Sequence, residues 1–172
     1  MKPARSEDGD RDRLGEFGLD YFTELTTQYV EDMPEARLID TQTQADRNAV
    51  WFDYDPAAAA SGDWKSSANS VEVSVSVYPG SPALTVGVDT RIPYHAFQAN
   101  AAWILHTCAD FGVGIDLDVK EETGDTWMFL FLRVFWAGYN YEVLTAAADD
   151  LAQCRKALEA RLPIEKGRAR GK

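Results

Sequence analysis

The side chains that could carry out chemistry in this sequence are a few aspartates and two histidines. Asp116 and Asp118 are two residues apart, as are Asp53 and Asp55, and this spacing places both carboxylates of a pair on one face of a strand. Such a pair, with Asp89 as a further oxygen ligand, could hold Mg²⁺ or Ca²⁺, or act as an acid–base pair if burial separated the two pKa values. Because Asp116 and Asp118 alternate with apolar residues, we expect both to face water, which favours an ordinary solvated strand face.

The histidines do not complete a metal site. His95 and His106 are eleven residues apart on one expected helix, about 16 Å at the helical rise per residue, which is too far for one ion. The sequence contains no phosphate-binding glycine loop, no nucleophile elbow and no zinc-type pairing of His with Cys. We therefore predict no catalytic residue, no metal site and no cofactor.

The periodicity of apolar residues indicates which elements would position these side chains. Steps of three and four predict helices, and strict alternation predicts strands. The expected helices span residues 16–31, 93–111 and 142–162, and the expected strands span residues 37–42, 48–54, 71–78, 84–89, 113–119 and 127–136. This order predicts an α+β fold, an antiparallel sheet flanked by helices in the order α-β-β-β(-β)-α-β-β-α. The strand 127–136 is apolar on both faces apart from Arg133, so we expect it to be central, and covered on both sides or half-covered by a partner.

Length and charge suggest one acidic domain. The chain has 172 residues, 45% of them hydrophobic, and a net charge of −11. We interpret residues 1–14 as a disordered arm, 15–162 as a single domain with a flexible loop at 56–69, and 163–172 as a basic tail. The charges of the arm cancel and those of the tail sum to +3, so the domain carries −14. Such a surface repels phosphate, which argues against nucleic acids and anionic membranes and favours a partner protein that is basic.

The two cysteines and the hydropathy of the chain indicate the cellular compartment in which we expect the protein. Cys108 and Cys154 both fall on apolar helix faces, where free buried thiols are common. No apolar segment follows Met1, and no apolar run approaches the length of a membrane span. These features lead us to expect a cytoplasmic protein.

The surplus of aromatic residues is the strongest hint of function. Trp103 lies about 120° from the centre of the apolar stripe of its helix, at 3.6 residues per turn, so it would cover a second element or meet another subunit. We therefore assign Trp103, with Ala99 and His106, to a homodimer interface. Candidate partner-binding residues are Phe17, Leu19, Phe22, Trp136 and Tyr139. Tyr and Trp are enriched at interfaces, although the same rings could all line one core.

The order of elements resembles the type III secretion chaperone-like fold, which the YbjN-like bacterial proteins share. Phe97-Gln98-Ala99-Asn100 resembles the leucine-x-x-asparagine stretch common there, and residues 112–117 resemble the strand entry that follows it. The resemblance extends over residues 16–162 by element order. It implies a small acidic homodimer that binds segments of other proteins and catalyses nothing. The long segment 55–70 and the density of Trp depart from that pattern.

We therefore expect a non-enzymatic protein-binding domain that captures an extended or helical apolar segment of a partner. Two other classes of function stay open. One is a metal-dependent hydrolase that uses Asp89, Asp116 and Asp118. The other is a small-molecule sensor with an aromatic pocket near Trp136 and Tyr139, which would require a closed cavity of about 300 Å³ or more.

Overall fold

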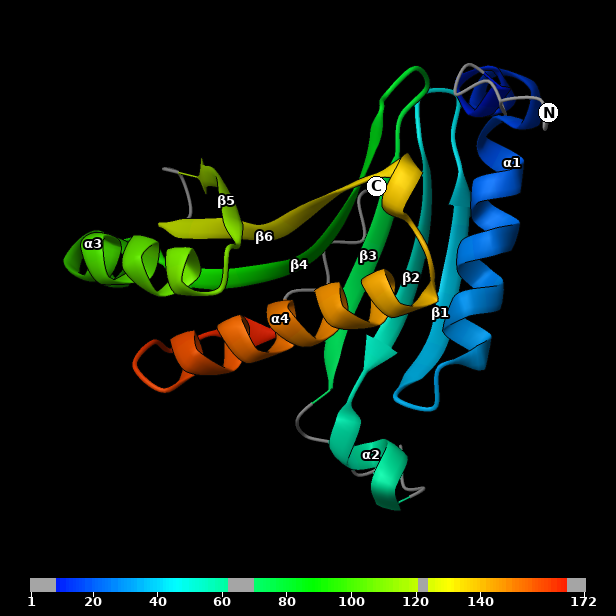
Figure 1. Ribbon diagram of the computed structural model, residues 1–172. Coiled ribbons are helices and arrows are strands. Elements are labelled where there is room, and N and C mark those ends of the chain that lie inside the picture. Colours follow the sequence, from blue (N-terminus) through cyan, green and yellow to red (C-terminus); the bar gives the residue numbers. More distant parts are fainter. Residues whose placement is uncertain (1–8, 62–69, 121–123, 167–172) are drawn as a thin grey trace, which may run out of the picture.

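The computed structural model describes residues 9–61, 70–120 and 124–166, and the side chains of residues 19–60, 70–119 and 124–164. The chain forms one antiparallel sheet with its long helices packed against it (Figure 1). The helices are α1 (Gly9–Asp32), α2 (Pro56–Ser61), α3 (Tyr94–Asp110) and α4 (Tyr141–Glu159), with a 3-10 turn η1 (Trp136–Gly138). The strands are β1 (Ala36–Thr43), β2 (Asn48–Tyr54), β3 (Val71–Val77), β4 (Ala83–Pro93), β5 (Gly114–Lys120), β6 (Asp125–Phe135) and β7 (Glu165–Lys166).

The strands follow the order β1-β2-β3-β4-β6-β5, and the short β7 pairs with β4. The longest pairing joins β4 to β6, from Ala83 opposite Phe135 to Pro93 opposite Asp125. The strand predicted at 127–136 is therefore central, as expected, because β6 lies between β4 and β5. By contrast, β3 pairs with β4 only over Ser74–Ser76, and beyond that point the two strands diverge (Figure 1).

Local sequence accounts for these elements and their ends. In β3 the valines at every second position are buried on the helix side, and Ser74 and Ser76 on the other face are buried as well. The helix α4 begins at an N-cap, where the side-chain oxygen of Asn140 accepts a 2.9 Å hydrogen bond from the backbone N–H of Val143. After α3, Gly112 adopts φ of +66°, a conformation that a residue with a Cβ rarely adopts.

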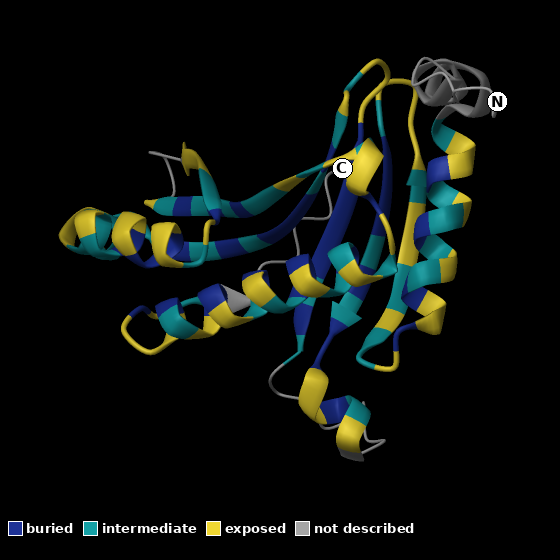
Figure 2. Ribbon diagram, in the orientation of Figure 1, coloured by how far each residue is buried: buried dark blue, intermediate teal, exposed yellow. Residues whose placement is uncertain are grey.

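The core lies on the side of the sheet that the three long helices cover. Helix α1 packs on β1, β2 and β3, α4 packs on β4 and β6, and α3 packs on β5, β4 and β6. The strand side chains that face these helices are almost fully buried, so the middle strands are dark in Figure 2. They include Val50, Phe52, Val73, Val75, Leu84, Val86, Val88, Met128 and Leu130. Each contributes about 1.5–3 kcal/mol by leaving water.

The α+β class and the order of the major elements are confirmed, and three boundaries were wrong. Helix α1 begins at Gly9, within the segment expected to be a disordered arm. Residues 56–61 form α2 where a loop was expected, and Glu165–Lys166 of the expected tail pair with β4. The remainder of these three segments, residues 1–8, 62–69 and 167–172, lies outside the described residues. No helix in the described ranges combines the length and hydropathy of a membrane span.

Candidate binding surface

The face of the sheet opposite the helices carries a row of aromatic side chains from β6. Trp127, Phe129 and Phe131 alternate with the buried Met128 and Leu130, so they point to the other side of the strand. The three are only half-buried and do not pack against the core cluster. Phe135, at the end of the same row, is 65% exposed. We call Trp127, Phe129, Phe131 and Phe135 the aromatic row.

Two glycines on the strands next to β6 allow the rings of Phe129 and Phe131 to pack flat against the sheet. A Cβ added at Gly87 of β4 would overlap the ring of Phe129, and a Cβ at Gly114 of β5 would lie 2.7 Å from Cζ of Phe131. The two phenylalanine rings are stacked, with centroids 5.9 Å apart and planes inclined by 20°. The glycines therefore convert a pleated strand surface into a flat aromatic platform.

Cationic side chains border the platform at both ends. The guanidinium of Arg133 lies 5.9 Å from the centroid of the Phe131 ring, and that of Arg91 lies 5.7 Å from the Trp127 ring. Arg91 is also paired with Asp125 across β4 and β6. Arg133 is exposed and forms no ion pair with another described residue. The rings therefore already engage cations through their faces.

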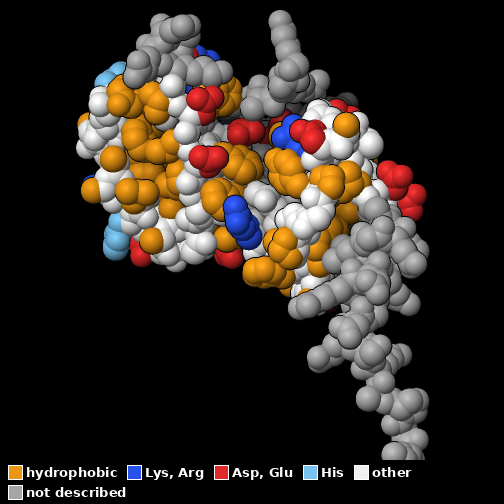
Figure 3. Space-filling view, turned by 90° about the horizontal axis from the view of Figure 1, so that it is seen from above, with side chains coloured by type: hydrophobic (Ala, Val, Ile, Leu, Met, Phe, Trp, Pro, Cys, Tyr) orange, Lys and Arg blue, Asp and Glu red, His pale blue; other side chains and the backbone are white. Residues whose placement is uncertain are grey.

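The pairing of the strands aligns one residue from each of five strands in a row that includes Phe131 of the platform. Trp51 of β2 lies opposite Ser74 of β3, Ser74 opposite Gly87, Gly87 opposite Phe131, and Phe131 opposite Gly114. The small residues lie in the middle of the row. The indole Nε1 of Trp51 is buried and has no hydrogen-bond partner. Hydrophobic and acidic side chains are also intermingled on the molecular surface seen from above (Figure 3).

The predicted carboxylates lie on this same face of the sheet. Asp89 of β4 and Asp116 of β5 are both opposite Phe129, one on each side, and Asp118 is opposite Trp127. The expectation that Asp116 and Asp118 are exposed is confirmed. Because β6 separates Asp89 from Asp116, their backbones are about 10 Å apart at normal strand spacing. No group of three or more His, Cys, Asp or Glu side chains among the described residues could hold a metal ion.

Asp89 differs from the other two because it is largely shielded from solvent. Burial, reinforced by the negative charge of Glu72 and opposed by Arg47, raises the pKa of the Asp89 carboxyl to about 6. No described Lys or Arg forms an ion pair with it. The group is therefore ionised at neutral pH under an electrostatic penalty.

Two of the predicted partner-binding residues belong to the core instead. Phe22 is 0% exposed and Tyr139 is 9% exposed. The Phe22 ring meets Trp136 edge-on at 5.6 Å, and the Tyr139 hydroxyl shares a 2.8 Å hydrogen bond with Thr26. These contacts join α1 to the η1 turn, so Phe22 and Tyr139 stabilise the fold and cannot meet a partner in this conformation.

The other residues of that set are only partly accounted for. Leu19 and Trp136 are half-buried against the core, and the Trp136 indole N–H donates to the carbonyl of Ser81 at 3.2 Å. The side chain of Phe17 lies outside the described residues. The aromatic rings at the junction contact one another, so self-packing explains the cluster that suggested a sensor pocket.

The residues assigned to a dimer interface have mixed environments. Ala99 and His106 are exposed on α3, as is Leu105 at 56%. Trp103 is half-buried against the core, and the guanidinium of Arg161 lies 4.9 Å from its ring. The chain itself therefore covers much of Trp103, and self-association through α3 stays a prediction.

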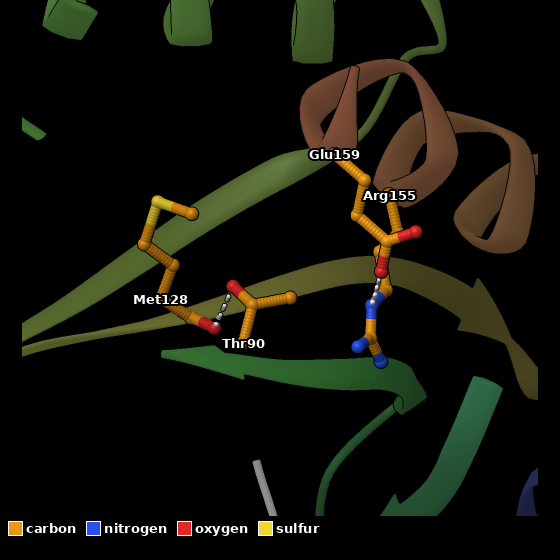
Figure 4. Close-up of polar contacts among 4 residues, drawn as sticks. All are labelled: Thr90, Met128, Arg155 and Glu159. Atoms are coloured by element: carbon orange, nitrogen blue, oxygen red, sulfur yellow. Dashed lines mark hydrogen bonds and ion pairs between the residues drawn. The ribbon is translucent and has the colours of Figure 1, made fainter. Parts of the chain in front are cut away.

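A buried cation lies on the helix side of the sheet. Arg155 of α4 is 3% exposed, its Nε donates to Oε1 of Glu159 at 2.9 Å, and its Nη2 has no hydrogen-bond partner (Figure 4). Nearby on β4, the Thr90 hydroxyl donates to the carbonyl of Met128 at 3.0 Å. A single guanidinium with one carboxylate partner is a structural ion pair and gives no reactive centre.

Comparison with known proteins shows a similar fold and nothing more. No protein-family model matches the chain, and no curated protein matches it. A crystal structure of an uncharacterized protein from Methanothermobacter thermautotrophicus has a similar fold. It superimposes with a TM-score of 0.57 at 12% sequence identity, over 80% of this chain and 94% of that one. The resemblance to type III secretion chaperones and YbjN-like proteins therefore stays a prediction.

Proposed function

We propose that this protein is a non-enzymatic binding domain that captures a segment of a partner protein on the aromatic row. The observation that carries the proposal is the position of Phe129 and Phe131. They occupy the sheet face that none of the three long helices covers, and they lie outside the core. Rings left half-exposed do not contribute the part of the hydrophobic free energy that full burial would give, and a partner could supply that burial. Aromatic residues outside a core are typical of interaction sites.

The sheet also offers a backbone edge for the same partner. β5 is the last strand in the sheet order, so its outer edge has no strand partner among the described residues. On the aromatic face this strand presents the exposed Asp116 and Asp118, whereas Leu117 and Val119, each 38% exposed, lie on the helix side opposite Met128 and Thr126. An extended segment could pair with the β5 backbone as an added edge strand. Its alternate side chains would then point to the face that carries Phe131 and Trp127, which lie on β6, the second strand from the added one.

The charge of the domain supports a basic partner. With a net charge of −11 for the chain, long-range attraction would accelerate encounter with cationic segments and slow encounter with anionic ones. A homodimer formed through the exposed side of α3 would leave the aromatic row free, because α3 packs on the other face of the sheet.

Selection from a random peptide library tests the proposal. Peptides selected against the wild-type protein should bind Phe131→Ser at least about tenfold more weakly, since truncating an aromatic hot spot typically costs about 2 kcal/mol or more. Leu105→Ser is the matched control, because Leu105 is also an exposed apolar residue but lies on α3. Its affinity for the peptides should change less than about twofold. Equal affinity of wild type and Phe131→Ser for every selected peptide would refute the proposal.

A further inference from the structure

An acidic row crosses the sheet beside the aromatic platform. Asp53 of β2 lies opposite Glu72 of β3, and Asp89 of β4 lies opposite Phe129, which lies opposite Asp116 of β5. Glu72 and Asp89 lie beyond the last β3–β4 pair, Ser74 opposite Gly87, where the two strands diverge. The charge of Glu72 nevertheless reaches Asp89 and disfavours its ionised form. Carboxylates of β4 and β5 therefore flank Phe129 at one level, and Asp53 and Glu72 form a second pair on β2 and β3.

The carboxylates of this row differ in how they are neutralised. Asp53 has an ion pair of 2.7 Å with Arg37, and Glu72 has a further interaction partner in the chain. Asp89 and Asp116 form no ion pair with a described residue. Arg47 acts on Asp89 electrostatically, and within the described part of the chain Asp116 accepts a hydrogen bond only from the backbone N–H of Leu117. Two carboxylates that have no ion-pair partner among the described residues therefore flank Phe129 in the sheet register.

The separation of these two carboxylates selects the kind of cation that fits. About 10 Å between the two backbones is too wide for one metal ion to bind both groups directly. The Phe129 ring leans toward Gly87 of β4, so an ammonium or guanidinium group on its face would lie nearer to Asp89 and would gain a cation–π contact as well. A second cationic side chain of the same segment could pair with Asp116. Arg133 over Phe131 shows the same kind of contact one position along the strand.

We propose that the partner segment presents lysine or arginine side chains beside Phe129 that pair with the carboxylates of Asp89 and Asp116. This inference rests on the proposed function, because it names the chemistry that the aromatic row would recognise. The cation would neutralise Asp89, whose ionised form is disfavoured by burial and by Glu72, with Arg47 as the opposing charge. An acidic or phosphate-bearing partner would meet the same carboxylates with repulsion.

The experiment uses the peptides selected from the library in matched pairs, with each Lys or Arg replaced by Gln in the second member. We expect the selected peptides to be enriched in Lys or Arg, and one such replacement to weaken binding about tenfold. Asp89→Asn and Asp116→Asn should each weaken binding about three- to tenfold. Asp110→Asn, which removes an exposed carboxylate from the end of α3, controls for the loss of general negative charge and should change affinity less than about twofold.

The pH dependence of peptide binding gives a second test of the inference. Affinity for a Lys- or Arg-containing peptide should fall as the pH is lowered from about 7.5 to about 5, because Asp89 takes up a proton in the free protein. The decrease should be smaller in Asp89→Asn. Peptides that lose affinity for Phe131→Ser but bind Asp89→Asn and Asp116→Asn normally would overturn the inference and leave the proposed function standing. Peptides that bind Phe131→Ser normally would overturn both.

Discussion

The ring of Phe129 occupies the space that a Cβ at position 87 would require, so the conformation of the aromatic platform depends on a glycine in the adjacent strand. Gly87→Ala should push the Phe129 ring off the sheet or move β4 away from β6. We expect a loss of about 1–3 kcal/mol in the free energy of unfolding, measured by urea denaturation, and weaker binding of the selected peptides. Gly138→Ala is the control, because nothing lies within 4 Å of the added methyl group. Equal destabilisation by both substitutions would contradict the close contact.

The raised pKa of Asp89 predicts a specific pH dependence of stability. The folded-state pKa of about 6 lies above the ordinary pKa of 3.8 for an aspartate carboxyl. Between these values the folded state therefore binds more protons, and stability falls as the pH rises through this interval. Asp89→Asn should accordingly stabilise the protein by about 1–2 kcal/mol at pH 7 and by little at pH 4. Thermal unfolding at several pH values, with Asp116→Asn as the exposed counterpart, measures the difference. A constant effect of Asp89→Asn from pH 4 to 7 would contradict this prediction.

The ion pair of Arg155 with Glu159 predicts opposite effects of two substitutions. Replacing a buried charge by an apolar side chain of similar length removes a desolvation penalty, whereas removing its partner leaves the charge unpaired. Arg155→Met should therefore be neutral or stabilising by about 1 kcal/mol. Glu159→Gln should destabilise by about 1 kcal/mol, a reduced value because Glu159 is 44% exposed. Denaturant titration of both variants tests the pair. A loss of 3 kcal/mol or more in Arg155→Met would show that the guanidinium has a further stabilising partner.

The two cysteines should be inert in the folded protein. Cys108 and Cys154 are buried, with Sγ atoms 3.7 Å apart between α3 and α4. The hydrogen bond shared with Cys108, together with burial, raises the pKa of the Cys154 thiol above its usual range. Neither thiol should react with a disulfide reagent at pH 8 within minutes, and both should react fully in denaturant. Rapid reaction of one equivalent in the native state would indicate that the α3–α4 contact opens readily.

Much of the fold could be predicted because apolar side chains alternate with polar ones along several strands. The valines of β3 and the apolar residues of β4 alternate clearly, and the β6 segment is long enough to mark a central strand. The helix beginning at Gly9 was missed because its first turns are charged and carry little apolar periodicity. Propensity alone does not separate such a segment from a disordered arm.

The candidate surface was harder to predict. Apolar residues on both faces of β6 left open whether both faces were covered by the chain or one by a partner. Only the pairing of Gly87 and Gly114 beside β6 shows how the rings lie, and pairing across strands is not encoded locally. Phe22 was assigned to partner contact although it belongs to the inward stripe of α1, which was a signal for the core.

Backbone amide chemical-shift mapping with one library-selected peptide tests the central claim most directly. We predict that the largest shifts fall on β4, β5 and β6, around Phe129 and Phe131, and that residues on the exposed side of α3 change little. Shifts concentrated on α3 or α1, with the aromatic row unchanged, would contradict the claim that this protein binds its partner on the face of the sheet opposite the long helices.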